Sequence, residues 1–507
     1  MKSDRQPFLD RARECAKLTL PSLFPDEAAT GAWTFSTPYQ SIGARGVNSL
    51  SSRLLMTQLP SNAPFFRLKL SDYDFRLLGN EKQRGKVEAA LAIIERTAID
   101  EIEAQALRVP LYEALRLLLI SGNALLVYQP QGGARVFRLD RYVVKRDPMG
   151  NVLEIIIHEQ VAPSTLPKKL LQQIQESNLQ DQNGEEDLST QKTLDLYTHM
   201  SRKGDGWTSY QEIRGRTIPS TRRTYPADRC PWLPLRFNRV NGESYGRGLV
   251  EEYYGDLRSL ETLTKAIVQG SAAAAKILLL VRPNGSTKIK EVKEAPNGAV
   301  IAGQAEDVTV LQLNKYADFR VAKDMMQELE QRLSGSFLMN SSIQRNGERV
   351  TAEEIRFMAQ ELEGALGGLY SVLALELQAP MVRLILANLE RRGKIPRLPT
   401  DKVKPQITTG IEALGRGMEL TKLQQFMALL QPLGPEVIAQ NLNVGDFIDR
   451  IGANLGIDTA GLIKSDEQKA QEAAQAQEMQ MQSAMADIAG KAAPNIVKGM
   501  NDGQQRQ

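Results

Sequence analysis

The sequence has 507 residues, of which 42% are hydrophobic and 24% are charged, a composition that is ordinary for a folded globular protein and excludes a chain that is disordered throughout. Its 63 Lys and Arg residues nearly balance its 60 Asp and Glu residues, which leaves a net charge of +3. This balance excludes a protein that wraps nucleic acid with a large basic surface, because such a protein needs a clustered excess of positive charge.

Cysteine content and hydropathy indicate the compartment. The two cysteines, Cys15 and Cys230, are too few for a disulfide framework, and the first residues are too charged for a signal peptide. The most apolar run, residues 267–281, is shorter than a membrane span and contains Lys276. We therefore expect a protein that is made in a reducing cytoplasm and has no transmembrane segment.

The first 250 residues read as a mixed body. Apolar spacing predicts a helix over 86–107, and a second helix begins at Pro110 and ends at Gly122. Alternating apolar runs between turn signals predict strands at 124–130, 135–139, 142–147, 152–161, 193–200 and 233–240. These elements predict an α+β body, in which the structure of residues 206–226 is left open.

A different pattern begins near residue 251. Apolar residues at spacings of three and four predict helices over 251–281 and 317–339, each with a net charge of −1, around a compact insert at 282–316 with Pro-Asn-Gly turns and short strands. Two helices that flank a small insert predict a hairpin arm. The arm carries a run of small residues that would let another backbone approach closely, with packing positions Gly270, Ala274 and Ile277.

A polar, basic loop follows the second helix. Thr351 and Glu354 form a predicted capping box, which fixes the start of a long amphipathic helix that Pro380 should kink or end. The loop at 340–350 is thus held between two helices, with its turn at Asn346 and Gly347. From local pattern alone, the simpler interpretation of this loop is a solvated connector between helices. For the insert lysines Lys288, Lys290 and Lys293, the simpler interpretation is a solvated surface.

The C-terminal part begins after Gly393 with a Pro-rich connector, and helices are predicted at about 411–431 and 435–455. Residues 465–494 are rich in Ala, Gln and Met, a composition that suits a helix which is stable only when packed against neighbours. The last dozen residues are expected to be disordered.

One motif suggests catalysis. Residues 242–246 (GESYG) have the form of a nucleophile elbow around Ser244, but both histidines, His158 and His199, precede this serine, whereas an α/β-hydrolase needs its histidine after it. No metal-ligand spacing and no phosphate-binding loop of the Walker type is present. We expect no cofactor, no metal and no enzymatic activity, and we keep a cytosolic serine hydrolase that uses Ser244 and a monomeric helical scaffold as alternatives.

The order of several longer motifs resembles a known family. The segments are LTLPSLFPDE (18–27), TPYQSIGARGVNSLSSRLL (37–55), RVPLYEALRLLLISGNALL (108–126), NGESYGRGLVEEYYGDLRSLE (241–261), ADFRVAKD (317–324) and QRNGERVTAEEIRF (344–357). In this order they resemble the portal proteins, or head-to-tail connectors, of short-tailed bacteriophages, the autographivirus-type podoviruses in particular. The resemblance extends from about residue 5 to about residue 470.

The resemblance implies a fold and an assembly. It implies a mainly helical α+β portal fold that forms a dodecameric ring around a central channel. Its parts would be a wing (1–250), two stem helices (251–281 and 317–339), a clip (282–316), a tunnel loop (340–350), a long wing helix with a connector (351–410) and a helical crown (411–507) with a disordered end.

The resemblance also implies a function, in which double-stranded DNA passes through the ring during packaging and ejection. The tunnel loop would face this DNA with Gln344, Arg345, Asn346 and Arg349, while Lys288, Lys290 and Lys293 would form a docking surface on the clip. The implied partners are the terminase large subunit, the tail adaptor protein, the capsid and scaffolding proteins and internal core proteins, with no membrane. The implied location is the head-tail junction of the virion, after assembly in the host cytoplasm.

Overall fold

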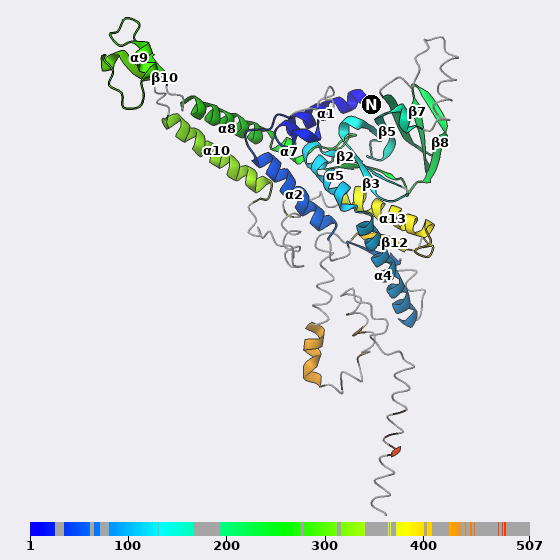
Figure 1. The fold of residues 1–507 in the computed structure, drawn as a ribbon. Coiled ribbons are helices and arrows are strands. Elements are labelled where there is room, and N and C mark those ends of the chain that lie inside the picture. Colours follow the sequence, from blue (N-terminus) through cyan, green and yellow to red (C-terminus); the bar gives the residue numbers. More distant parts are fainter. Residues whose placement is uncertain are drawn as a thin grey trace, which may run out of the picture. The chain divides into compact units, whose positions relative to one another are not determined.

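The fold was analysed in a computed structural model, which describes residues 1–25, 35–60, 65–70, 81–129, 131–166, 193–274, 278–311, 316–339, 372–399, 403–407 and 425–434 and a few single positions among the others (Figure 1). The chain divides into two units, residues 1–413 and 414–507. In the second unit, residues 425–430 are helical and Gln431–Leu433 form a 3-10 turn, while most of the predicted helices at 411–431 and 435–455 and of the segment 465–494 lie outside the described residues.

Helices form much of the core of the first unit. They are α1 (Lys2–Lys17), α2 (Ile42–Gln58), α4 (Glu81–Ala104), α5 (Arg108–Ser121) and α13 (Ala379–Arg391). The predicted helices at 86–107 and after Pro110 are thereby confirmed as α4 and α5. Gly122 ends α5 in the left-handed region with φ of 73°, and a Cβ atom there would lie 2.3 Å from the backbone of Arg247, so that only glycine fits.

Two antiparallel sheets pack with these helices. The smaller has the order β3-β2-β9 and consists of β2 (Asn123–Tyr128), β3 (Ala134–Phe137) and β9 (Trp232–Arg236). The larger runs in sequence order and consists of β4 (Tyr142–Arg146), β5 (Val152–Val161), β6 (Leu194–Lys203), β7 (Gly206–Ile213) and β8 (Arg216–Pro226). All six predicted strands are confirmed, with ends that shift by up to four residues.

The hairpin β7–β8 was not predicted from the sequence. Arg214 and Gly215 connect its strands and both have positive φ, 50° and 77°, which is the backbone of a two-residue type I′ turn. Most side chains of β8 are exposed because it lies at the edge of the sheet. An edge strand of this kind lacks the apolar alternation by which half-buried strands are identified.

The arm consists of α7 (Leu249–Glu252), α8 (Tyr254–Ala274) and α10 (Tyr316–Ser336). The insert contains β10 (Leu278–Val281), α9 (Ile289–Glu294) and β11 (Val308–Leu311), and β10 pairs with β11 in antiparallel register. The prediction of one helix over 251–281 was wrong at both ends, since Tyr253 separates α7 from α8 and residues 278–281 form a strand. This apolar run gains a strand partner in β11, about thirty residues later in the sequence.

Pro380 does not end its helix, which was one of the two predicted outcomes: residues 372–391 are helical throughout, with a π turn just before the proline. Residues Ala374–Gln378 form a π turn, and Pro380 then lies in the first turn of α13, where a missing N–H costs little. After α13, Gly393 has φ of 69°, and the Pro-rich connector ends in β12 (Val403–Ile407). β12 pairs with β1 (Phe66–Leu70), a second pairing that was not predicted.

Candidate channel and docking elements

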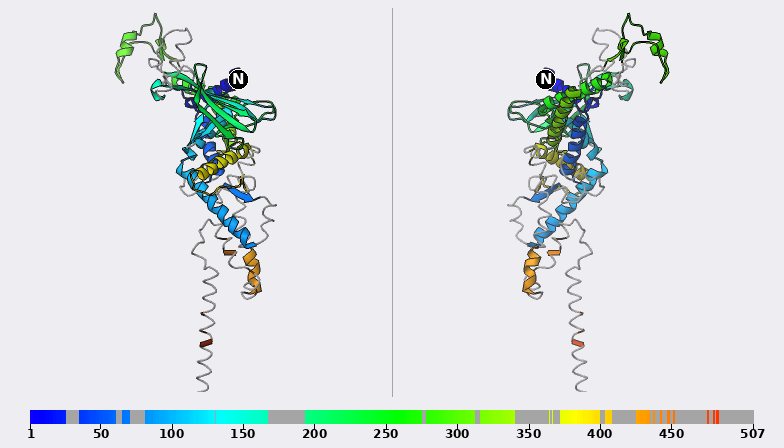
Figure 2. Two further views of the ribbon diagram at one scale, coloured as in Figure 1. Left: turned by 90° about the vertical axis from the view of Figure 1, so that its right-hand side faces the viewer. Right: turned by 90° about the vertical axis from the view of Figure 1, so that its left-hand side faces the viewer.

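The arm is an antiparallel pair of helices, α8 and α10, that lie side by side (Figures 1 and 2). Nη2 of Arg332 lies 2.9 Å from Oδ2 of Asp256, and the Oγ1 atom of Thr264 lies 3.5 Å from Sδ of Met326, so residue numbers rise on one helix as they fall on the other. Near the body, the pair is fully packed, because Leu257, Leu260 and Leu333 have no exposed area. The leucine spacing that predicted these helices is therefore the spacing of their buried contacts.

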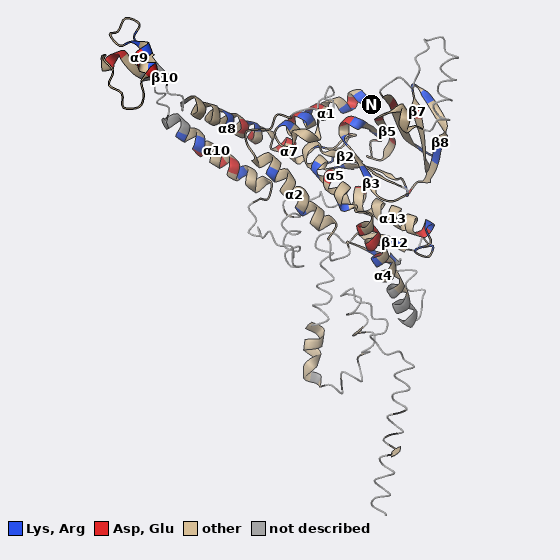
Figure 3. Cartoon of the chain, in the orientation of Figure 1, with Lys and Arg blue, Asp and Glu red and all other residues tan. Residues whose placement is uncertain are grey.

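Farther from the body, the arm exposes apolar side chains. Val268 of α8 is 49% exposed, and Val321 and Met325 of α10 are 64% and 49% exposed. The charges of the arm nearly cancel. In α8 the two acids Asp256 and Glu261 balance the two bases Arg258 and Lys265, and α10 has four acids and three bases. Positive and negative positions are interspersed along both helices (Figure 3). The arm is therefore an almost neutral surface, as its sequence predicted, and it also has an exposed apolar component that the sequence did not predict.

Carboxylates fix the base of the arm to the body. Oε1 of Glu251 lies 2.7 Å from Nη1 of Arg11 and 2.9 Å from Nη1 of Arg247, and the carboxylate of Glu261 accepts the backbone N–H groups of Tyr39 and Gln40. These contacts join α7 and α8 to α1 and to the segment before α2. The arm thus leaves the body at a defined place.

The C-terminal end of α10, next to the body, is closed by an unusual residue. Leu338 has φ of 53°, and the N–H of Met339 donates to the carbonyl of Ser334, which is the pattern of a helix C-cap usually made by glycine. Nη1 of Arg53 donates to the carbonyl oxygen of Leu338 at 2.6 Å. This contact to α2 holds the chain where it enters residues 340–350.

The predicted DNA-facing residues Gln344, Arg345, Asn346 and Arg349 lie outside the described residues. The capping box at Thr351 and Glu354 and the packing position Ile277 also lie outside them. Of the predicted packing positions, Gly270 is half-buried and Ala274 is the last residue of α8, and residues 271–273 between them are exposed.

The insert places its three predicted lysines on the surface. Lys288, Lys290 and Lys293 are exposed around α9, and Nζ of Lys288 lies 3.2 Å from Oε1 of Glu291. Ile289, at 62% exposed, and Val300 add apolar area to the same insert. The insert therefore offers a mixed basic and apolar surface.

A buried carboxylate organises the insert. Asp307 is 4% exposed and accepts hydrogen bonds from the hydroxyl of Ser286, the hydroxyl of Thr287 and the N–H of Thr287 at 3.1 Å each. Burial alone would raise the pKa of Asp307, but these hydrogen bonds outweigh it and lower the pKa below its ordinary value. The charged form is thus the one that the folded insert stabilises.

Replacing Asp307 by Ala should open the insert, because the N–H of Thr287 and two hydroxyl groups then lose their acceptor. We expect limited proteolysis within 282–307 to become at least tenfold faster, while cleavage elsewhere is unchanged. Because the folded pKa is the lower one, the stabilisation is present at neutral pH and is lost as the pH falls through the folded pKa. The wild-type insert should therefore loosen only in acid, and unchanged proteolysis of the variant would contradict this role.

The nucleophile-elbow alternative finds no geometric support. The carbonyl oxygen of Ser244 accepts a hydrogen bond from Nε of Arg146, while His158 pairs with Asp195 at 2.9 Å and His199 with Glu212 at 3.2 Å on the larger sheet. Neither histidine contacts Ser244 within the described residues. Gly242 has φ of 83°, and the motif forms a glycine turn before α7.

Among the described residues, no group of three or more metal-ligating side chains occurs, and no helix is long and apolar enough to cross a membrane. Burial raises the pKa of the Cys15 and Cys230 thiols to about 12, so neither forms a reactive thiolate at neutral pH.

A buried ionic cluster joins distant parts of the sequence and was missed by sequence reasoning. The carboxylate of Glu376, in the π turn, accepts from the backbone N–H and the guanidinium of Arg236 on β9 and lies 3.9 Å from Arg146 on β4. Both arginine side chains are 4% exposed. The cluster therefore fixes the helix that follows residues 340–371 against both sheets.

Comparison with known proteins now identifies the class. Residues 1–463 match the family described as bacteriophage head to tail connecting protein, and the chain belongs to this family. Three proteins named portal protein are similar to it over nearly their whole length: that of Escherichia phage T7 (42% identity, 95% of this chain and 90% of the relative), that of Enterobacteria phage T3 (41%, 92% and 88%) and that of Enterobacteria phage SP6 (31%, 97% and 94%). The resemblance predicted from the sequence is confirmed, and the function is that of a phage portal protein at the head-to-tail connection.

Proposed function

We propose that this portal protein is a non-enzymatic ring of twelve copies at one capsid vertex and that double-stranded DNA enters and leaves the head through its channel. The observation that carries the proposal is the exposed apolar face of the arm, formed by Val268, Val321 and Met325 in a chain of the connector family. In a closed ring each copy contacts its neighbours through two different patches, and the arm of a neighbour would cover this face.

The charge of the arm suits a channel. A polyanion slides past a surface only if few phosphates are held at once, because each neutralised phosphate adds to the affinity and slows release. The acids and bases of α8 and α10 cancel almost completely, so arms that line a channel would not retain DNA.

We assign the parts of the ring as follows. Residues 251–281 and 317–339 would be the stem, 282–316 the clip, 340–350 the tunnel loop, 1–250 and 351–410 the wing, and 411–507 the crown. The clip would dock the terminase large subunit during packaging and the tail adaptor protein afterwards, using Lys288, Lys290 and Lys293. Capsid, scaffolding and internal core proteins would contact the wing and crown, and assembly would take place in the host cytoplasm.

The first experiment is the solution mass of the purified chain by light scattering, with negative-stain images of the same fraction. A particle of about twelve times 56.3 kDa with a central hole is expected. A chain that stays at 56.3 kDa even with scaffolding protein added would reject the ring and favour the helical scaffold.

Charge reversal at the predicted tunnel loop tests the DNA-facing residues. The variant Arg345→Glu/Arg349→Glu should assemble normally, yet package or retain DNA at least tenfold less well, because ring symmetry multiplies two arginines into a circle of positive charge. DNA in purified heads measures the effect, and Arg222→Glu/Arg223→Glu, at two exposed positions of β8, serves as a control for charge change elsewhere. Disassembly of the Arg345/Arg349 variant would instead give these residues a structural role.

A further inference from the structure

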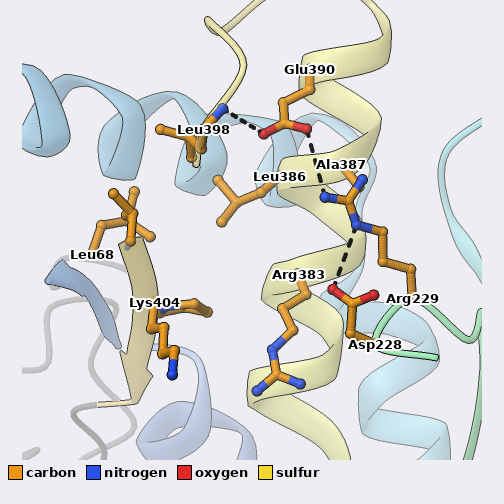
Figure 4. A pocket seen from close by; sticks show the side chains of 11 residues that line it. Leu68, Asp228, Arg229, Arg383, Leu386, Ala387, Glu390, Leu398 and Lys404 are labelled. Carbon is orange, nitrogen blue, oxygen red and sulfur yellow. Dashed lines mark hydrogen bonds and ion pairs between the residues drawn. The ribbon is translucent and has the colours of Figure 1, made fainter. Parts of the chain in front are cut away.

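A pocket in the first unit lies apart from the arm and the insert. It is a cavity of about 300 Å³ between α13, the strand pair β1–β12 and the loop that precedes β9 (Figure 4). Its walls come from four separate stretches of sequence: Leu68, Asp228, Arg229, Arg383, Leu386, Ala387, Glu390, Leu398, Val403, Lys404 and Pro405. None of the functions proposed above uses it.

The floor of the pocket is apolar. Leu68, Leu386 and Val403 are 4%, 6% and 9% exposed and come from β1, α13 and β12. Ala387 is the small residue of the α13 wall, and its short side chain leaves room that a larger one would fill. The volume and lining suit one large apolar side chain of a ligand.

The rim of the pocket carries an unbalanced positive charge. Arg229 lies between two acids, 3.9 Å from Oε2 of Glu390 and 3.7 Å from Oδ2 of Asp228, and the other oxygen of Glu390 accepts the N–H of Leu398 at 2.9 Å. Both acids thus form ion pairs with Arg229. Arg383 and Lys404 form no ion pair or hydrogen bond with any part of the chain that the structure describes, and both are exposed.

The two unpaired cations lie where a ligand could meet both. Figure 4 shows Arg383 on α13 and Lys404 on β12 at the same end of the space, with their charged groups on either side of it. A carboxylate placed between them would form charge-assisted hydrogen bonds to both. An apolar group attached to it would then reach the floor at Leu386.

We propose that this pocket is a docking site for an acidic peptide segment of another protein, with an apolar side chain on the floor and a neighbouring carboxylate between Arg383 and Lys404. The charge complementarity selects the ligand: an apolar floor alone would accept any hydrophobic residue, whereas the two free cations favour one flanked by Asp or Glu. One buried anchor with a polar rim is the usual form of such contacts. The proposal is independent of the ring and its channel.

Saturation-transfer NMR with the full-length protein tests this docking, because it detects weak binding to a large particle. The probe is the synthetic peptide Gly-Ser-Gly-Asp-Leu-Asp-Gly-Ser-Gly, and the leucine methyl signal is measured. We expect clear transfer from the wild type and at least a fivefold loss with Arg383→Glu/Lys404→Glu. The charge-preserving variant Arg383→Lys/Lys404→Arg should retain at least half of the signal, and added salt should reduce it.

Three further measurements separate the outcomes. The variant Ala387→Leu keeps every charge and places three more carbon atoms inside the cavity wall, so it should also reduce the transfer at least fivefold. Circular dichroism checks that each variant is folded. A peptide with Asn in place of both Asp residues should lose most of the signal. Three results would each overturn the proposal. The first is an equal signal from the Asp and Asn peptides, and the second is no transfer from the wild type. The third is transfer with monomers but not with the assembly, which would show that a second copy of the chain fills the pocket.

Discussion

Replacing Glu376 by Ala is expected to lower the free energy of unfolding by roughly 3–5 kcal/mol, because it leaves two buried guanidinium groups without their carboxylate. The side chains of Arg146 and Arg236 are 4% exposed, and that of Glu376 is 14% exposed. Burial lowers the pKa of Arg146 to about 10, a sign that the protein interior disfavours its charge. In the variant, Arg146 still donates to three backbone carbonyl oxygens. Arg236 loses the carboxylate that accepts hydrogen bonds from its backbone N–H and its guanidinium.

Urea unfolding at a fixed protein concentration measures this loss, since assembly would otherwise shift the apparent stability. Glu376→Gln should lose less, because its amide oxygen can still accept the N–H of Arg236. The matched control is Glu159→Ala, whose partner Arg135 is 54% exposed, and it should cost less than about 1 kcal/mol. Similar losses for Glu159→Ala and Glu376→Ala would refute a special role for the buried cluster.

The sequence was most informative where one period extends over several turns. The leucines of α8 and α10 predicted both helices and their buried faces, because a spacing of three and four residues leaves few alternatives. The same rule failed at Leu278–Val281, since a short apolar run fits a buried helix or a strand equally well and the partner that decides is remote in sequence. The edge strand β8 was missed because its side chains are mostly exposed.

Among the candidate sites, too, some features were predicted from the sequence and others were not. Exposure of Lys288, Lys290 and Lys293 followed from the polar composition of the insert. The contact between Arg236 and Glu376 joins residues 140 positions apart, and no local pattern marks either residue as buried. The positions of Arg383 and Lys404 at one pocket were equally hidden, because the pairing of β1 with β12 is what brings Lys404 beside α13. Tertiary pairing, which a single sequence does not specify, accounts for each omission.

The second large effect is expected where the arm packs on α2. Phe337 at the end of α10 has no exposed area, and a Cβ atom on Gly46 of α2 would lie 2.4 Å from Cγ of its ring. Phe337→Ala should therefore cost about 3–5 kcal/mol, as a fully buried aromatic side chain leaves a cavity. Gly46→Ala should cost about 1–3 kcal/mol from overpacking, although alanine favours a helix more than glycine does.

The double variant Gly46→Ala/Phe337→Ala distinguishes this packing from two unrelated defects. Because the methyl group that Gly46→Ala introduces would occupy part of the space left by the ring of Phe337, the double variant should lose at least about 1 kcal/mol less than the sum of the two single losses. Gly335→Ala is the matched control, since a Cβ atom on this exposed glycine of α10 meets nothing within 4 Å, and it should leave stability unchanged or raise it by up to about 1 kcal/mol. If the loss of the double variant equalled the sum of the two single losses, Gly46 and Phe337 would act separately. The small size of Gly46 would then not be needed for packing the C-terminal end of α10 on α2.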